Sequence, residues 1–210
     1  MKNIDNLTIV IVTYKTSENI IFNFLKSINR SVKVLIIENS DKFIHEIKIL
    51  SNFSNVEVYC TGDNLGYGKG NNFGLKLVKT DFVLILNPDV ICEKDFFSKI
   101  TDVITRVENF TIIGCQYLND KIYMPAGFFN KKENLKFKDN FMNNKVNALS
   151  KVEWVTGCSM LINLKKFDDK EIFDKNFFLY FEEIDLCKSI INKGGNIFSS
   201  QDLKIHHLGF

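Results

Sequence analysis

One apolar run that stops abruptly at a proline constrains the fold of this chain more than any other feature. Residues 82–86 read FVLIL, and Asn87, Pro88 and Asp89 follow directly. A short apolar run of this kind predicts a strand buried on both faces, which is typical of parallel sheets. Ligands of open α/β sheets bind beyond the carboxyl ends of such strands, so Asp89 is a candidate ligand-binding residue. Asn-Pro and Pro-Asp are also common in turns, and the tripeptide taken alone favours a simple turn.

Strands and a helix alternate in the amino-terminal part of the chain. Residues 7–14 (LTIVIVTY) predict a strand, and residues 16–18 predict the cap of a helix whose apolar positions recur over residues 20–28. Residues 32–37 (VKVLII) and 55–60 (NVEVYC) predict two more strands. This order, with polar residues after the strands, predicts an α/β fold whose mostly parallel, Rossmann-like sheet is flanked by helices and binds a nucleotide.

A glycine-rich segment follows the fourth of these elements. Residues 63–72 read DNLGYGKGNN, with three glycines and three asparagines. Glycines let backbone amides approach an anion closely, and a helix expected over residues 73–78 would direct its positive amino end the same way. The spacing matches neither the dinucleotide fingerprint nor a P-loop, which excludes those two interpretations.

Length and composition favour a single domain over residues 1–210. The chain is 45% hydrophobic, which suffices for one sizeable core, and its net charge of +2 is too small to indicate a nucleic-acid partner. Five cysteines without C-x-x-C spacing predict free thiols in a reducing cytosol rather than a zinc site. The sequence shows no signal peptide and no apolar run long enough to cross a membrane.

One segment, residues 130–145, reads as low in order. Its lysines alternate with aromatic residues and methionine, and the favoured interpretation is a solvated surface loop. The alternative is a flap that contacts a membrane or a lipid-linked molecule, because basic and aromatic residues together suit an anionic interface.

The carboxyl-terminal third contains acidic residues and histidines that could take part in chemistry. Glu182 and Glu183 follow an aromatic run at the start of a helix that Gly194 and Gly195 would end. In isolation, such an acidic pair is more often a favourable partner of the helix dipole. His206 and His207 follow a last expected strand. A histidine in such a place is more often a surface or core residue than a ligand.

Taken together, the motifs resemble those of the family 2 inverting glycosyltransferases. The matching segments, in order, are TIVIVTY, IIENS, DNLGYGKGNN, LNPDV, WVTG and FLYFEEIDLC, and the match as a whole runs from about residue 7 to residue 209. The sequence is most similar to the bacterial rhamnosyltransferase-like branch, which builds surface polysaccharide. The resemblance implies a GT-A fold, with residues 1–90 as the half that binds the nucleotide sugar and residues 91–210 as the acceptor and catalytic half.

The resemblance also implies ligands and a location. The donor would be a dTDP- or UDP-sugar, the cofactor a divalent metal (Mn²⁺ or Mg²⁺), and the acceptor a glycan or a lipid-linked molecule. The protein would work in the cytoplasm or peripherally at the inner face of the cell membrane. Asn87 departs from the acidic first position of the family's Asp-X-Asp motif, which leaves the site one negative charge short. The residues implied for the nucleotide sugar are Thr13, Tyr14, Glu38, Asn39, Asp63, Asn64, Gly66, Lys69, Asn72 and Asn87.

For the metal, the resemblance points to Asp89 and to a histidine about two dozen residues after the catalytic base. By the family pattern the base would be the second acidic residue of the pair, Glu183, and counting from it favours His207 over His206. A base is needed because the acceptor hydroxyl must lose its proton as it attacks the anomeric carbon. Asp185 and Glu182 are the alternative bases, since they share a helical face from which Glu183 is rotated away.

Two other interpretations remain open. Asn87, and a glutamate at position 183 where the family more often has aspartate, leave room for a non-catalytic homologue that only binds nucleotide sugars. A nucleotidyltransferase is less favoured, because its glycine-rich loop would be near the amino terminus whereas this one follows residue 60.

Overall fold

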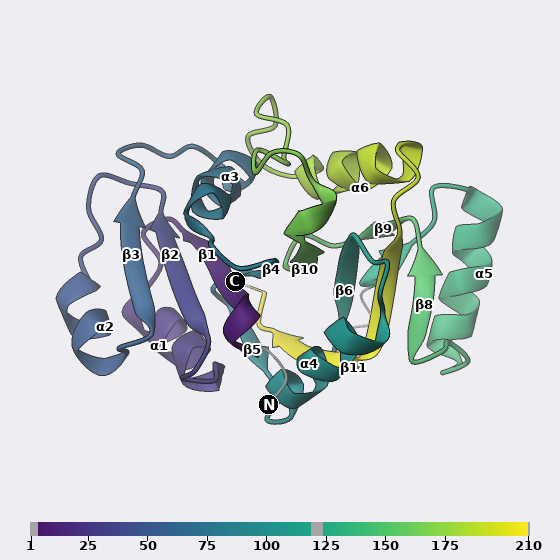
Figure 1. The fold of residues 1–210 in the computed structure, drawn as a ribbon, viewed down its shortest axis with the longest axis horizontal. Coiled ribbons are helices and arrows are strands. Elements are labelled where there is room, and N and C mark those ends of the chain that lie inside the picture. Colours follow the sequence, from purple (N-terminus) through teal and green to yellow (C-terminus); the bar gives the residue numbers. More distant parts are fainter. Residues whose placement is uncertain (1–3, 119–123, 210) are drawn as a thin grey trace.

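Residues 4–118 and 124–209 are described by a computed structural model, in which helices pack on both faces of a curled sheet (Figure 1). The helices are η1 (Ile4–Asn6), α1 (Glu18–Ser27), α2 (Glu46–Asn52), α3 (Tyr67–Leu77), α4 (Phe96–Arg106), α5 (Lys131–Met142), η2 (Leu164–Lys166) and α6 (Glu182–Asn192). The strands are β1 (Leu7–Thr13), β2 (Lys33–Glu38), β3 (Val56–Cys60), β4 (Phe82–Leu86), β5 (Val90–Cys92), β6 (Ile112–Tyr117), β7 (Ala126–Gly127), β8 (Leu149–Val152), β9 (Trp154–Val155), β10 (Ser159–Asn163) and β11 (Ile197–His207).

The main sheet has a parallel part and a mixed part. Its order is β3-β2-β1-β4-β10-β6-β11-β5, and β8 also pairs with β11. Strands β3, β2, β1 and β4 are mutually parallel, as the sequence predicts. Strand β10 then runs antiparallel to both β4 and β6, and β11 is parallel to β6 but antiparallel to β5 and β8. The carboxyl ends of β1, β2 and β4 therefore share one edge of the sheet.

Two hydrophobic clusters, one on each face of the sheet, hold the helices. Helices α1, α2 and α4 contribute to the first cluster, for example through Phe24 and Phe96, which are both fully buried. Helices α3, α5 and α6 contribute to the second, for example through Leu75 and Cys187. Truncating a buried phenylalanine such as Phe24 to alanine costs about 3–5 kcal/mol, so each face is a substantial part of the total stability.

The lysine-rich segment of residues 130–145 was predicted to be a surface loop, and this prediction is wrong because most of the segment forms helix α5. The side chain of Asn130 caps the helix by accepting hydrogen bonds from the backbone N–H groups of Lys132 (2.9 Å) and Glu133 (3.2 Å). Phe137 is buried and packs edge-on against Phe128, with ring centroids 5.6 Å apart. A good cap and a single buried ring therefore order a helix whose remaining surface faces solvent.

Helix α3 also departs from expectation, because it starts at Tyr67 rather than near residue 73 and so includes most of the glycine-rich segment. None of the helices in the described part of the chain has the length and apolar character needed to cross a bilayer.

Candidate functional site

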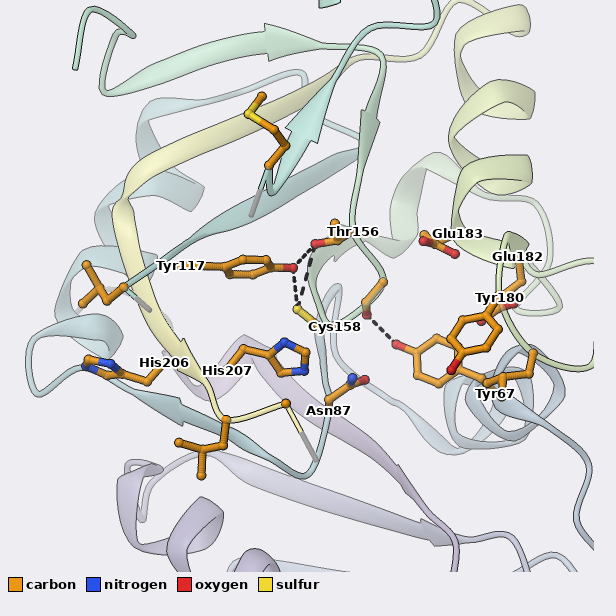
Figure 2. Close-up of a pocket in the computed structure, with 16 residues that line it drawn as sticks. Tyr67, Asn87, Tyr117, Thr156, Cys158, Tyr180, Glu182, Glu183, His206 and His207 are labelled. Atoms are coloured by element: carbon orange, nitrogen blue, oxygen red, sulfur yellow. Dashed lines mark hydrogen bonds between the residues drawn. The ribbon is translucent and has the colours of Figure 1, made fainter. Parts of the chain in front are cut away.

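A pocket with a volume of about 940 Å³ opens where the two halves of the sheet meet (Figure 2). Its walls come from the start of α3, the end of β4, the end of β6, the segment between β9 and β10, the first turn of α6 and the end of β11. The residues that line it are Tyr67, Asn87, Tyr117, Leu118, Met124, Thr156, Gly157, Cys158, Leu179, Tyr180, Glu182, Glu183, His206, His207, Leu208 and Gly209.

The acidic pair at the start of α6 lies in this pocket. Glu182 and Glu183 both line it, whereas Asp185 is not among the lining residues. Adjacent residues can share the pocket because the helix only begins at Glu182, directly after Phe181, whose φ of 71° lies in the left-handed region. Tyr180 has a φ of 68°, so two consecutive non-glycine residues take this strained conformation at the site.

The environment of the two glutamates differs. Burial raises the pKa of Glu183, while the backbone amides of Glu183, Ile184 and Gly157 partly counteract this by stabilising the charged form. Glu182 is only 4% exposed, its Oε2 has no hydrogen-bond partner among the described residues, and burial raises its pKa too. A carboxyl group with a raised pKa in a pocket is a candidate for proton transfer.

A carboxylate and an imidazole lie close together at the opposite side, where His207 lines the pocket and Asp89 is not among the lining residues. The Nε2 atom of His207 lies 3.4 Å from Oδ2 of Asp89, and the His207 ring is tilted on Tyr117 with centroids 5.9 Å apart. Asp89 Oδ2 also accepts a hydrogen bond from the backbone N–H of Gly209 (3.2 Å). The neighbouring His206 also lines the pocket, but its ring points away from Asp89 and pairs with Glu93 (2.6 Å), because successive side chains of a strand face opposite sides.

This donor set fits a divalent cation only as a partial site. A carboxylate oxygen and an imidazole nitrogen are suitable ligands for Mn²⁺, and carboxylate oxygen suits Mg²⁺. Within residues 4–118 and 124–209, no group of three or more His, Cys, Asp and Glu side chains is placed to hold a metal. Asp89 and His207 could therefore hold a cation whose other ligands come from substrate oxygens and water.

Most of the residues implied for the nucleotide sugar lie outside this pocket, and four of them are at the carboxyl ends of β1 and β2: Thr13, Tyr14, Glu38 and Asn39. Glu38 is buried, and its carboxylate accepts hydrogen bonds from Thr13 Oγ1 (2.6 Å), Ser40 Oγ (2.7 Å) and the backbone N–H of Lys15 (3.0 Å). Tyr14 is exposed beside this network. Asn87 alone, of the ten residues implied for the nucleotide sugar, lines the pocket itself.

The glycine-rich segment is held by other parts of the protein. Asn39 donates from Nδ2 to the carbonyl of Gly66 (2.8 Å), and Asn64 Oδ1 accepts from the N–H of Gly66 (3.1 Å). Asp63 is exposed and Lys69 is half-buried. The side chain of Asn72 is buried and forms two hydrogen bonds with the backbone of Phe173.

Sequence reasoning assigned no role to several polar side chains of the pocket, among them Tyr117, Thr156 and Cys158. The hydroxyl group of Tyr117 contacts Thr156 Oγ1 and lies 2.6 Å from Cys158 Sγ (Figure 2). Burial raises the pKa of Tyr117 and raises that of Cys158 to about 12, so both groups are protonated at neutral pH. The WVTG segment contains Thr156 and the glycine-rich segment contains Tyr67, but nothing in the sequence pointed to Tyr117 or Cys158.

Comparison with known proteins gives a family match and two curated relatives. The model of a family described as "Glycosyl transferase family 2" matches residues 8–169. The low-salt glycan biosynthesis hexosyltransferase Agl10 of Haloferax volcanii is 26% identical over 212 residues, which cover 97% of this chain and 67% of the relative. Rhamnosyltransferase WbbL of Escherichia coli K12 is 23% identical over 212 residues, with coverages of 85% and 74%.

Three solved structures share the fold. GalNAc-T7 with UDP, GalNAc and Mn²⁺ has a TM-score of 0.71 at 13% identity. The mannosyltransferase PcManGT from Pyrobaculum calidifontis, in complex with GDP-Man and Mn²⁺, has a TM-score of 0.67 at 11% sequence identity. S. aureus TarS 1–349 has a TM-score of 0.63 at 14% sequence identity. In this order, the three structures match 96%, 96% and 93% of this chain. This chain in turn spans only 42%, 56% and 60% of the length of those chains. At these identities the likeness concerns the fold alone, which is GT-A.

Proposed function

Since this chain belongs to glycosyl transferase family 2, we propose that it is an inverting glycosyltransferase that moves a hexosyl group, such as rhamnosyl, from a nucleoside-diphosphate sugar to a hydroxyl group. The observation that best supports this is the placement of Glu183. Its carboxyl group is half-buried at the start of α6, has a raised pKa and lies in the pocket that also contains Asn87 and His207 (Figure 2).

In the proposed reaction, the Glu183 carboxylate accepts the proton of the acceptor hydroxyl as its oxygen attacks the anomeric carbon. The bond between that carbon and the diphosphate oxygen breaks, and its electron pair leaves with the nucleoside diphosphate. Attack from the face opposite the leaving group inverts the anomeric centre in one displacement. A general base of this kind contributes roughly 10²–10⁴-fold to the rate. Glu182 and Asp185 are the alternative bases, and Glu182 has the better placement because it lines the pocket.

Asp89 and His207 would hold a divalent cation, with Mn²⁺ favoured by the imidazole ligand. The cation would supply Lewis-acid stabilisation of the departing diphosphate. His206 is the weaker candidate because Glu93 already engages its Nε2. Asn87 adds an amide oxygen or N–H near the same strand end without adding charge.

The donor base and ribose would lie at the carboxyl ends of β1 and β2. The four lone-pair sites of the Glu38 carboxylate already accept three hydrogen bonds, so one remains for a donor N–H. Tyr14 is exposed where a base could stack on it. In this proposal residues 1–90 bind the donor and residues 91–210 supply the acceptor site and the base.

The acceptor in this proposal is a growing surface glycan or a lipid-linked molecule. Support comes from the relatives, one a glycan-biosynthesis hexosyltransferase and the other a rhamnosyltransferase. We place the reaction in the cytoplasm or at the inner face of the cell membrane, with peripheral contact at most.

A panel of dTDP- and UDP-sugars with Mn²⁺ tests the proposal. Thermal shift would first identify the donor, because a ligand that binds only the folded state raises its apparent stability. Mass spectrometry would then follow transfer to hydroxyl acceptors, and NMR would give the anomeric configuration of the product. Retention of configuration would refute the inverting mechanism. Donor binding without hydrolysis or transfer would instead identify a non-catalytic homologue.

A further inference from the structure

The glycine-rich start of α3 is attached to the segment that leads into the acidic pair. Tyr67 makes two of the contacts: its backbone N–H donates to the carbonyl of Phe178 (3.0 Å), and its hydroxyl donates to the carbonyl of Gly157 (Figure 2). Burial raises the pKa of Tyr67 well above its usual value, so the hydroxyl keeps its proton at neutral pH and remains a donor.

Asn72 makes a second attachment one and a half turns further along α3. Its Nδ2 donates to the carbonyl of Phe173 (2.8 Å), and its Oδ1 accepts from the backbone N–H of the same residue (3.0 Å). The Asn72 side chain is buried, with an exposed residue fraction of only 6%. Binding a ribose, phosphate or sugar through this amide would require breaking both hydrogen bonds.

Glycines at this position allow the close packing. A Cβ on Gly66 would lie 2.0 Å from the carbonyl oxygen of Phe178, and Gly66 itself has a φ of +81°. A Cβ on Gly68 would lie 3.3 Å from Phe173 and 3.5 Å from Glu182. The glycines therefore let the backbone of residues 173–182 approach α3, in addition to any anion they might admit.

The contact at Gly157 leads directly to Glu183. A Cβ on Gly157 would lie 3.4 Å from Cβ of Glu183, so the two residues are already in close contact. The backbone amide of Gly157 is one of those that stabilise the Glu183 carboxylate. The carbonyl of Gly157 accepts the hydroxyl of Tyr67, and the Gly157 residue thus links Tyr67 to Glu183.

We propose that Tyr67 and Asn72 are positioning residues, which hold Gly157 and residues 173–181 and thereby fix the carboxylate of Glu183 against the acceptor. This inference rests on the proposed role of Glu183 as the base. It gives the DNLGYGKGNN motif a task beyond donor binding, namely joining the donor half of the site to the acceptor half.

Two conservative variants with matched controls test it. Tyr67→Phe removes only the hydroxyl, and Asn72→Ala removes the amide. The controls are Tyr59→Phe, whose hydroxyl donates to Glu57 (2.9 Å), and Asn55→Ala, whose amide donates to the carbonyl of Val32 (2.7 Å). Neither control residue lines the pocket. Should Asn72→Ala fail to fold, Asn72→Ser keeps a small polar side chain at this buried position and loses the paired hydrogen bonds with Phe173.

Amide hydrogen exchange needs no substrate and measures directly whether the hydrogen bonds of Tyr67 and Asn72 order the segments that they hold. We expect faster exchange around residue 157 in Tyr67→Phe and over residues 173–178 in the Asn72 variant, with no such change in either control. Exchange that stays at the wild-type rate in both variants overturns the proposal. If the wild-type protein transfers no sugar, the proposed function fails, but the exchange result still decides whether these attachments order the segment.

Kinetics separate positioning from donor binding. We expect kcat to fall roughly tenfold to hundredfold in both variants, as for a small misplacement of a catalytic group, with the affinity for the nucleotide sugar unchanged. In Tyr67→Phe the acid limb of the pH profile of kcat should move to higher pH, because a displaced Gly157 amide no longer favours the charged form of Glu183. A loss of donor affinity in proportion to kcat would show that Tyr67 and Asn72 are donor ligands and overturn the inference.

Discussion

His207 and Asp89 lie 3.4 Å apart between Nε2 and Oδ2, although they are 118 positions apart in the sequence. Strand β5, which pairs antiparallel with the end of β11, brings them together by aligning His207 with Val90. The contact therefore depends on the same backbone register that turns His206 away toward Glu93.

Removing Asp89 should weaken metal-dependent donor binding. We expect Asp89→Ala and His207→Ala to lower Mn²⁺ affinity by roughly 10–100-fold or more, since a direct ligand contributes at least as much as a residue that only orients one. Donor affinity should fall with it because the diphosphate loses its counterion. Calorimetric titration of Mn²⁺ and nucleotide measures both. His206→Ala is the control, and an equal loss in that variant would contradict the assignment.

Glu182 should limit stability near neutral pH. Its pKa is raised in the folded protein, so the folded state binds more protons than the unfolded state between the two pKa values. The stabilising contribution is complete below the unfolded pKa and is lost as the pH rises through the folded one. Glu182→Gln should therefore raise the free energy of unfolding at neutral pH, by on the order of 1 kcal/mol, and the gain should vanish in acid. Urea denaturation across pH measures this, and a gain that does not depend on pH would contradict it.

Helix α5 presents a surface that could contact an anionic membrane. Leu135 and Met142 are 53% and 46% exposed and lie seven residues apart, on one side of the helix, with Lys131, Lys132, Lys136 and Lys138 around them. We expect sedimentation with anionic vesicles that weakens with salt, since each lysine near such a surface contributes about 1 kcal/mol.

Replacing these four lysines by glutamine should abolish the sedimentation. Lys165→Gln with Lys166→Gln, in an exposed turn outside α5, is the control for charge alone. Equal binding to neutral vesicles, or no dependence on ionic strength, would leave α5 as an ordinary solvated helix.

Local sequence signals were sufficient for the parallel part of the fold. The apolar runs at β1, β2 and β4 and the spacing of Ile21, Phe24 and Leu25 in α1 predict those elements because burial on the sheet dictates their pattern. Helix α5 was not predicted because its lysines outnumber its buried residues. The only helix signals in this segment are the buried Phe137 and the capping Asn130.

Long-range contacts of the candidate site had no local signal. Asn72 and Phe173 are 101 positions apart, and a buried asparagine in a glycine-rich segment looks the same in sequence whether it binds a ligand or the protein's own backbone. Likewise, Glu182 and Asp185 do lie in the first turn of α6, but a shared helical face did not reveal which side chains line the pocket. The helix starts at Glu182, directly after two left-handed residues, and Glu182 and Glu183 line the pocket together whereas Asp185 does not.

The pH dependence of turnover should report the raised pKa of Glu183. A general base acts in its deprotonated form, so kcat should fall as the pH decreases through this pKa. Because burial raises the pKa, the fall should begin at higher pH than for an exposed carboxyl group. The measurement is kcat at saturating donor and acceptor over the range in which the fold is stable. A rate that stays constant down to the usual range of carboxyl groups would argue against Glu183 as the base.

Glu183→Gln separates binding from chemistry. Glutamine keeps the size of the side chain and its hydrogen bonding but cannot accept the proton, so kcat should fall by roughly 10²–10⁴-fold. Donor affinity, measured by calorimetry with Mn²⁺, should not change, because Glu183 lies on a different wall of the pocket from His207 (Figure 2). Asp185→Asn, outside the pocket lining, is the matched control and should keep its activity unless Asp185 is the base. Lost donor binding in Glu183→Gln would assign Glu183 to the donor or metal site, and full activity would leave it a favourable partner of the α6 dipole.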